Sequence, residues 1–261
     1  MTIEPFSFET AYQSDLQSLW ALLVAPTAFL AWRAARPTDP TRARVPEASR
    51  FVAGLTLCFA VLTMVDPICT GPVADLGVLQ GTYVPTLIMF FFVLLGDLRV
   101  LLLAIGVARP EQTLGRRLGW AGAVTLVVPI GTGILYGALD ALVDDLHGQW
   151  LWMIYEAGFA LLCVGLSRRW LPRSLEGEPD AVEKADFLRD VFAYSTAYYV
   201  LWLSADALIV LGDLDLGWAI RMVPNQLYYA LWVPFVYARF YSAPPAPRPD
   251  VPVLREGNAS R

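Results

Sequence analysis

Seven long apolar stretches divide this chain. They span residues 16–34, 51–72, 83–108, 117–138, 150–170, 188–212 and 216–241. Each is close to or longer than the ~20 residues that a helix needs to cross the hydrocarbon core of a bilayer. The pattern therefore predicts an all-α integral membrane protein, built as a bundle of seven transmembrane helices.

The basic residues predict how this bundle is oriented. Apart from Arg99 and Arg221, every arginine and the only lysine lie in or beside the connections after the first, third, fifth and seventh stretches. The remaining connections carry aspartates instead, such as Asp75, Asp140 and Asp213. Because positively charged loops stay in the cytoplasm, the N-terminus is expected outside and the C-terminus inside. A bacterial inner (cytoplasmic) membrane is the expected location.

The composition fits one membrane domain. Hydrophobic residues make up 56% of the chain and charged residues 16%. We expect the domain to cover residues 1–242, followed by a disordered, Pro-rich cytoplasmic tail at 243–261. The basic residues are spread over short loops, which argues against a nucleic-acid partner. Membrane lipids, a small ligand, a second copy of the chain and a cytoplasmic signalling protein are the partners left open.

Metal chemistry is not expected from this sequence. Cys58, Cys69 and Cys163 have unrelated spacings, and His147 is the only histidine. Structural zinc sites need four such ligands, and catalytic sites usually need three. We therefore predict no metal site and no disulfide framework.

Polar side chains inside the apolar stretches are the best guide to function. An ionisable group at the centre of a bilayer costs at least ~2.5 kcal/mol, so it is usually paired and functional. The groups are Asp97 and Arg99 in the third stretch, Glu156 in the fifth, Asp206 in the sixth, and Arg221, Asn225 and Gln226 in the seventh. Counting from the helix ends places most of them in the outer half of the bundle. This predicts a shared cavity between the third, fifth, sixth and seventh helices.

Two interpretations of Arg221 remain open. It shares a helix face with Asn225, and it is expected to pair with Asp206 or Glu156. The pair either forms part of a ligand or proton site, or locks the sixth and seventh helices together.

Asp97 and Arg99 are separated by two positions, so they point roughly 160° apart on a helix. Asp97 facing the bundle would suit proton storage or acid catalysis. Arg99 is expected to extend toward the cytoplasmic interface.

Aromatic residues add an apolar wall to the predicted cavity. Tyr198 and Trp202 are four positions apart in the middle of the sixth stretch, and Tyr229 lies in the seventh. They either line a flat pocket or simply pack the helices together. The candidate ligand-binding residues are Glu156, Tyr198, Trp202, Asp206, Arg221, Asn225, Gln226 and Tyr229.

A family resemblance appears in this region. Residues 196–203, with the sequence TAYYVLWL, resemble the sixth-helix stretch of microbial rhodopsins, and Asp97 resembles their cytoplasmic-side proton donor. The stretch 216–241 has no lysine, however, and Tyr229 falls near the position of the retinal-binding lysine. The only lysine, Lys184, lies in a predicted connection. The resemblance implies a rhodopsin-like bundle without covalent retinal, in which a noncovalent apolar molecule is the only cofactor left open.

A second resemblance implies an enzyme. Residues 203–209 (LSADALI), 228–231 (YYAL) and 96–98 (GDL) are similar to motifs of lysoplasmalogenase-like membrane hydrolases. That resemblance would make Asp97 and Asp206 a catalytic pair that activates water on an ether lipid. The two residues have different predicted depths, and one helix of that family is missing. Whether the protein is an enzyme stays open at this point. The interpretation we favour is a sensor, receptor-like or transport protein that binds a small apolar or amphipathic ligand.

Overall fold

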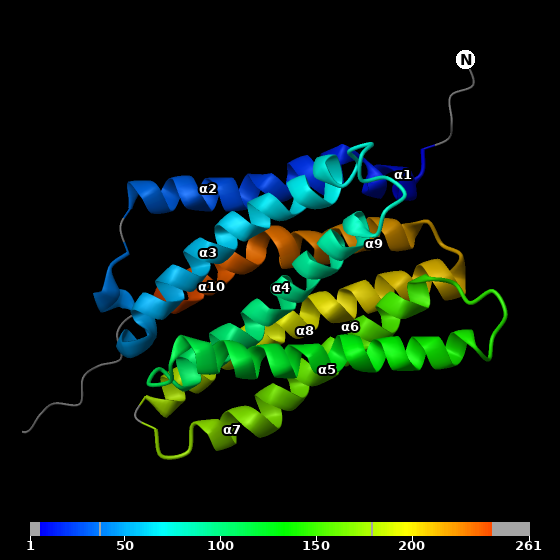
Figure 1. Cartoon of the computed structure of the whole chain (residues 1–261). Helices are drawn as coiled ribbons and strands as arrows, with labels where there is room; N and C mark the ends of the chain where they lie inside the picture. The colour runs from blue at the N-terminus through cyan, green and yellow to red at the C-terminus, as the bar shows by residue number, and fades with distance from the viewer. Residues whose placement is uncertain (1–5, 37, 179, 242–261) are drawn as a thin grey trace, which may run out of the picture.

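The computed structural model describes residues 6–36, 38–178 and 180–241 (Figure 1). Over these ranges the chain is helical and contains no strand, which confirms the predicted all-α class. The predicted tail at 243–261 lies outside the described residues.

Six helices of the described chain are long and apolar enough to cross a membrane. They run over Leu16–Ala35, Pro46–Val73, Val84–Ala108, Leu114–Asp140, Gln149–Ser174 and Ala181–Gly212. Each of these helices overlaps one of the first six predicted stretches, in the same order. The seventh stretch is also helical but is not among the six, so the seventh crossing and the orientation stay predictions.

Several of the long helices contain short π or 3₁₀ turns between their α-helical parts or at their ends. The first half of the chain forms α1 (Phe8–Gln13), a π-helical turn (Leu16–Trp20), α2 (Ala21–Ala35), two short 3₁₀ turns (Pro40–Arg42 and Pro46–Ala48), α3 (Ser49–Ile68), a π turn (Cys69–Val73) and α4 (Val84–Ala108). The second half forms α5 (Leu114–Asp140), α6 (Gln149–Gly165), a π turn (Leu166–Trp170), α7 (Leu171–Ser174), α8 (Ala181–Gly212), α9 (Leu216–Asn225), a π turn (Gln226–Leu231) and α10 (Trp232–Tyr241).

The last helical run, from α9 to α10, occupies the interior of the bundle. It contacts α8 on one side and α2 and α3 on the other (Figure 1). Trp232 and Phe240 of α10 are fully buried, as are Tyr198 and Phe187 of α8. This run therefore forms much of the surface on which the other helices pack.

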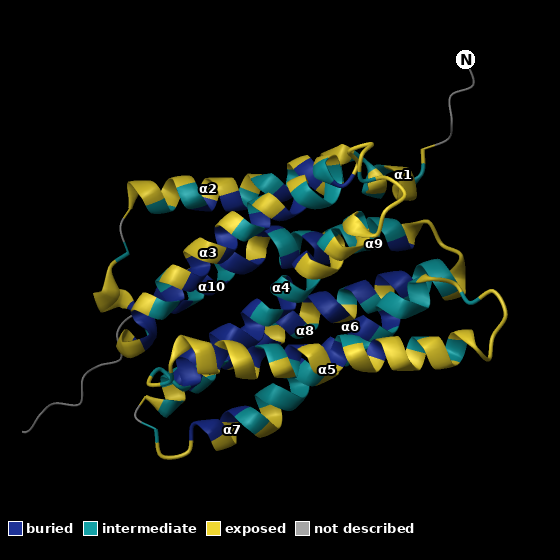
Figure 2. Ribbon diagram, viewed as in Figure 1, coloured by how far each residue is buried: buried dark blue, intermediate teal, exposed yellow. Residues whose placement is uncertain are grey.

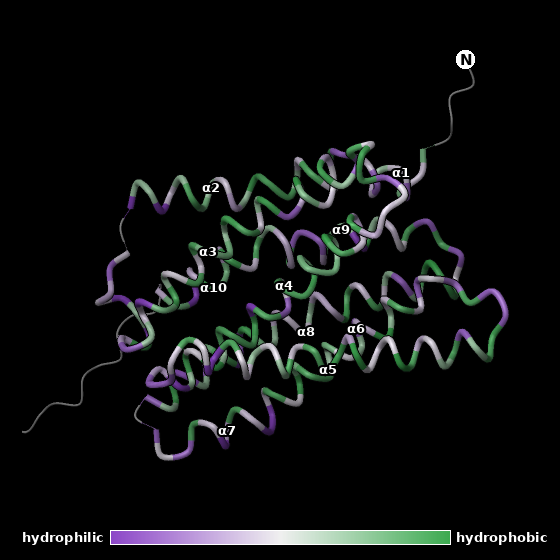
Figure 3. The backbone as a smooth tube through the Cα atoms, in the orientation of Figure 1, coloured by the Kyte–Doolittle hydropathy of each residue, from purple (hydrophilic) through white to green (hydrophobic). Residues whose placement is uncertain are grey.

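The outward faces of the helices are apolar. Figure 2 shows exposed residues along α2, α3 and α5, and Figure 3 shows that polar residues gather mainly in the connections at the bundle ends. On α5 the exposed residues include Val127, Ile130 and Ile134. A helix with such a face is suited to contact lipid rather than water.

One predicted boundary was wrong. The sixth helix begins at Ala181, whereas its apolar stretch begins at residue 188. Residues 183–190 carry several charges, but Glu, Lys and Arg are good helix formers, so the helix extends beyond its apolar part. Lys184, predicted in a connection, lies in α8 and is only 1% exposed, with its ammonium 3.2 Å from Glu178.

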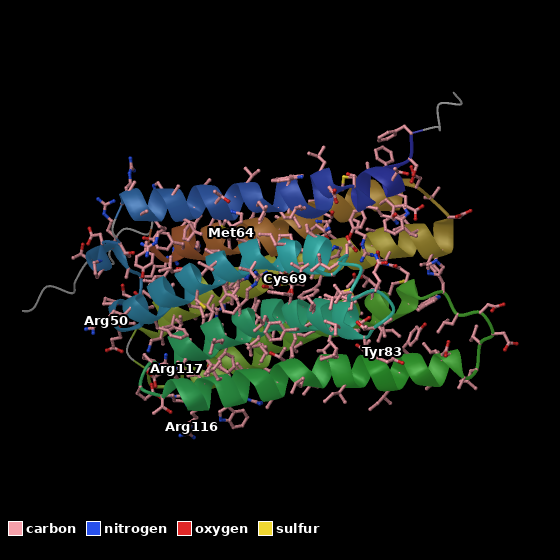
Figure 4. The ribbon with its side chains drawn as sticks, turned by 45° about the horizontal axis from the view of Figure 1, so that its top comes forward. Arg50, Met64, Cys69, Tyr83, Arg116 and Arg117 are labelled. Carbon is pink, nitrogen blue, oxygen red and sulfur yellow. The ribbon has the colours of Figure 1, made fainter. Side chains whose placement is uncertain are left out.

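Charge is separated along the bundle. Figure 4 shows Arg50, Arg116 and Arg117 at one end and Tyr83 at the other. Arg117 is buried, and its guanidinium carbon lies 4.8 Å from the centre of the Phe51 ring. The clustering of arginines at one end agrees with the sequence pattern, while the side of the membrane that this end faces stays a prediction.

Helices α8 and α9 approach so closely that residue 217 has to be glycine. A Cβ atom at Gly217 would lie 2.6 Å from the carbonyl oxygen of Ala205 and 2.6 Å from a side-chain carbon of Ile209. The carbonyl belongs to the α8 backbone and cannot rotate away. We expect Gly217→Ala to lower the free energy of unfolding by about 1–3 kcal/mol, measured as thermal unfolding in detergent.

Gly133→Ala is the matched control. Gly133 lies inside α5, and a Cβ atom there would meet no atom within 4 Å. Alanine is favoured over glycine in a helix interior by up to ~1 kcal/mol, so this variant should be neutral or slightly stabilised. Equal melting temperatures for the two variants would contradict the close α8–α9 contact.

Candidate functional site

The carboxylate of Asp97 in α4 is surrounded by tyrosine hydroxyls. Tyr155 of α6 donates to its Oδ2, and Tyr199 of α8 donates to its Oδ1. Tyr228, from the last helical run, donates to the same Oδ1 at 3.2 Å. Asp97 is only 2% exposed. Hydrogen bonds from two tyrosines, and a third shared between Asp97 and the carbonyl of Val93, thus replace the water that the carboxylate has lost.

Gly96 makes room for this arrangement. A Cβ atom at residue 96 would lie 1.9 Å from the hydroxyl oxygen of Tyr228. The same hydroxyl lies 3.0 Å from the carbonyl oxygen of Val93, one turn earlier in α4. Asp97 therefore supplies the carboxylate, and the absence of a side chain at Gly96 leaves the space that Tyr228 needs to reach it.

The prediction for Arg99 was wrong. Its side chain does not extend to the interface but is 2% exposed, and it donates to the backbone carbonyl of Tyr228. Its guanidinium carbon lies 4.6 Å from the ring centres of both Tyr228 and Trp232. A backbone oxygen and two aromatic faces replace water as partners for the cation. Asp66, 7% exposed, lines a small void next to Arg99.

A second polar network joins α1, α6, α8 and α9. Arg221 forms an ion pair with Asp206, one of the two partners predicted from the sequence. Gln149 donates to the other oxygen of Asp206 at 2.7 Å. The Nε of Arg221 donates to the hydroxyl of Tyr12 at 3.0 Å. Because Asp206 is fully buried, each of these partners helps to compensate for its lost hydration.

Asn225 extends this network. Its amide nitrogen donates to the Tyr12 hydroxyl at 3.2 Å, and its oxygen accepts a hydrogen bond from the Trp202 indole at 2.9 Å. Tyr12 belongs to α1, whose first backbone amides, at Phe8 and Glu9, donate to Asp215 at 2.8 and 3.1 Å.

Sequence reasoning missed Tyr12. The short helix α1 precedes the first apolar stretch and has no apolar signature of its own. The signal that could have found this helix is Ser7, whose hydroxyl caps it by accepting a hydrogen bond from the amide of Thr10.

A cavity of about 300 Å³ lies between these two networks. Five of the residues predicted from the sequence line it, namely Glu156, Trp202, Arg221, Asn225 and Tyr229. Asp97, predicted as a catalytic candidate, also lines it together with its three tyrosines, and the structure adds Tyr12, Met89, Val93 and Trp152. The cavity is thus bounded by α4, α6, α8 and the last helical run, the four elements expected from the sequence.

The other three candidates do not line this cavity. Tyr198 is fully buried and packs edge-on against Trp202 and Tyr228, with ring centres 5.8 and 5.3 Å apart. Asp206 is occupied by Arg221 and Gln149, and Gln226 begins the π turn. Tyr198 and Asp206 therefore lie behind the cavity wall and support the residues that form it.

Glu156 is the polar group of the cavity that the protein leaves incomplete. It is 3% exposed, and its Oε2 has no hydrogen-bond partner among the described residues. A buried carboxyl oxygen without a donor is unfavourable by roughly 1–3 kcal/mol or more. The site therefore suits a proton or a hydrogen-bond donor at this oxygen.

Carboxyl groups outnumber guanidinium groups around the cavity. The acidic residues that line it are Asp97 and Glu156, and the basic residue is Arg221. Within the described chain, no three His, Cys, Asp or Glu side chains are grouped as a metal site. The imidazole of His147 accepts a hydrogen bond from the amide of Gln149, the first residue of α6, at 3.1 Å. Protons or an organic cation could therefore neutralise the carboxyl group that has no basic partner in the cavity wall.

No protein-family model, curated protein or solved structure matches the chain. The resemblances to microbial rhodopsins and to lysoplasmalogenase-like hydrolases stay predictions.

Removing one hydroxyl from Asp97 should weaken the fold. We expect Tyr155→Phe and Tyr199→Phe each to lower the free energy of unfolding by roughly 1–3 kcal/mol, because each leaves a buried carboxylate with one donor fewer. Thermal unfolding in detergent measures the effect. Tyr83→Phe is the control, since Tyr83 is 86% exposed. If both buried variants melt like the control, these hydrogen bonds do not stabilise the bundle.

Proposed function

We propose that this chain is an integral membrane protein that binds a small amphipathic molecule, noncovalently, in the cavity beside Glu156. It would act as a receptor-like or transport protein, with the run Leu216–Tyr241 as a seventh crossing. The observation that carries the proposal is the buried oxygen of Glu156, which lines this cavity and has no hydrogen-bond partner among the described residues.

The burial of the last helical run supports a seventh crossing. Its polar residues Arg221 and Asn225 face partners inside the bundle, and α10 is covered by α2, α3 and α8. A helix that is shielded from lipid by its neighbours needs less apolar composition than the outer helices do. With seven crossings, the two ends of the described chain lie on opposite sides, as the arginine pattern predicts.

The cavity walls indicate the chemical class of the ligand. Trp152, Trp202 and Tyr229 offer aromatic faces, and Glu156 and Asp97 supply acidic groups. Aromatic faces together with a carboxylate favour an ammonium or hydroxyl group attached to an apolar body. The volume of about 300 Å³ fits a small molecule rather than a phospholipid with two acyl chains.

The mode of binding follows from the residue types present. Leu216–Tyr241 has no lysine, so an aldehyde ligand has no amine there with which to form a Schiff base. Tyr229 lines the cavity near the position at which the rhodopsin resemblance would place that lysine. Hydrogen bonds and aromatic contacts, rather than a covalent bond, would therefore hold the ligand.

The test is to purify the protein in mild detergent and identify by mass spectrometry any organic molecule present in stoichiometric amount. We expect an amphipathic compound with a hydrogen-bond donor. Glu156→Gln should reduce its retention by about tenfold or more, since a hydrogen bond to a charged group contributes about 1.5–3 kcal/mol. Trp202→Ala should also reduce its retention, because it removes an aromatic side chain from the cavity wall.

Two matched controls lie outside the cavity. Glu176→Gln makes the same chemical change at an exposed position, and Trp20→Ala removes an indole that is 61% exposed. Both should retain the compound at the level of the unmodified protein. Absence of any stoichiometric compound, or equal retention in all four variants, would exclude the binding proposal.

A membrane-embedded ether-lipid hydrolase is the second candidate. The observation that favours it is that Asp97 and Glu156 line one cavity in different surroundings, the first with three donors and the second with a free oxygen. Two such carboxyl groups suit separate acid and base roles. Asp206, the partner implied by the family resemblance, is engaged by Arg221 and Gln149, so Glu156 takes its place in this proposal.

This candidate is tested with a vinyl-ether lysophospholipid. Addition of water to the vinyl ether and cleavage of the C–O bond release a fatty aldehyde and leave the free alcohol. Asp97→Asn and Glu156→Gln should each slow aldehyde release by about 10²-fold or more. Asp140→Asn, at an exposed position of α5, is the control. Aldehyde release that is unchanged in both cavity variants would contradict the mechanism.

A further inference from the structure

A second and larger cavity lies at the arginine-rich end of the bundle. Its volume is about 530 Å³, and it shares no lining residue with the cavity beside Glu156. Its walls come from α4, α5 and the segment formed by the π turn Leu166–Trp170 and α7. In Figure 1 these elements meet at the end of the bundle where α7 is labelled.

Three arginines form the polar part of this cavity. Arg109 follows α4, while Arg169 and Arg173 come from the π turn and α7. Leu166 and Trp170 also line it, and residues spaced by three or four along a helix share one face. The helix that continues α6 therefore presents two guanidinium groups and two apolar side chains to the same cavity.

The positive charge of this cavity is only partly neutralised. Arg109 lies 3.0 Å from Glu178, which also accepts a hydrogen bond from Lys184 at 3.2 Å. Arg169 and Arg173 have no ion-pair partner among the described residues, and both are exposed. An anion placed between them would meet two guanidinium groups that no protein carboxylate occupies.

Below the arginines the cavity is apolar. Leu101 and Ile105 of α4 face Val124 of α5 across it. From Leu101 to Arg109 the wall extends about 12 Å along the helix axis, at 1.5 Å per residue. Charge at one end and an apolar wall along the rest match an anion that carries a hydrocarbon chain. A free phosphate would use only the charged end.

One buried polar atom in the cavity wall also has no hydrogen-bond partner among the described residues. It is the Oε1 of Gln112, which lines the cavity beside Arg109. An acceptor in this position fits a hydroxyl donor in the headgroup of a lipid.

We propose that this cavity binds an anionic phospholipid, with its phosphate on Arg169 and Arg173 and an acyl chain along the apolar wall of α4 and α5. Basic cavities between membrane helices bind anionic headgroups in this way. The outward-facing apolar surface of α5 gives a lipid direct access from the bilayer. The proposal is independent of the ligand in the cavity beside Glu156.

The experiment compares phosphatidylglycerol with phosphatidylcholine. The full-length protein is incubated with equal amounts of both lipids in detergent, and native mass spectrometry records which lipid stays bound. We expect a preference for phosphatidylglycerol. The double variant Arg169→Ala/Arg173→Ala should reduce that preference roughly 30-fold, because each basic residue near an anionic lipid contributes about 1 kcal/mol.

The control removes the same charge elsewhere. Arg116 (Figure 4) and Arg168 are both exposed, and neither lines this cavity. Arg168 lines a different surface hollow, together with Phe192. Arg116→Ala/Arg168→Ala should therefore keep the preference within about threefold of the unmodified protein. If the cavity variant does not fold, Arg173→Ala alone should reduce the preference about fivefold.

Three outcomes would overturn the proposal. The unmodified protein could retain both lipids equally, which would show that headgroup charge is not recognised. The control variant could lose as much preference as the cavity variant, which would indicate general surface charge. Inorganic phosphate at millimolar concentration could displace the lipid completely, which would identify the cavity as a site for a free anion.

Discussion

A carboxylate inside a helix bundle has lost its water, and Asp97 recovers its hydrogen bonds from hydroxyls on three other elements. Each hydroxyl reaches the carboxylate only if its helix has the correct rotation and depth. The same requirement brings Tyr228 against α4, which in turn places its backbone carbonyl next to Arg99. Satisfying one buried charge therefore fixes the positions of α4, α6, α8 and the last helical run together.

The cavity beside Glu156 follows from how the two polar networks are completed. On one side of the cavity, tyrosine hydroxyls donate hydrogen bonds to Asp97. On the other side, Arg221 forms an ion pair with Asp206. Glu156 lies between them, and no described residue donates a hydrogen bond to its Oε2. The bulky aromatic residues around it keep the space open because they are held by contacts behind the wall, such as that between Tyr198 and Trp202. A pre-formed cavity with aromatic walls and a few polar groups has the general character of small-molecule sites.

The sequence was sufficient to locate the six long apolar helices and most of the buried polar groups, since long apolar stretches and rare membrane charges are visible without a structure. It also limited the partner of Arg221 to Asp206 or Glu156, and the structure shows that the partner is Asp206. It could not assign the hydroxyls around Asp97, because a tyrosine in an apolar helix gives the same signal whether it packs or donates. Arg99 was misplaced because its partners, a backbone carbonyl and two aromatic rings, carry no charge.

The π turn at Gln226–Leu231 restricts which insertions and deletions this segment can accept during evolution. A π-helical turn closes with a hydrogen bond to the fifth residue instead of the fourth, so it holds one residue more than an α-helical turn. Losing or gaining a single residue there would rotate α9 by about 100° relative to α10. In homologous chains we therefore expect a one-residue length difference to be tolerated in this segment only if the facing polar residues of α9 have changed as well.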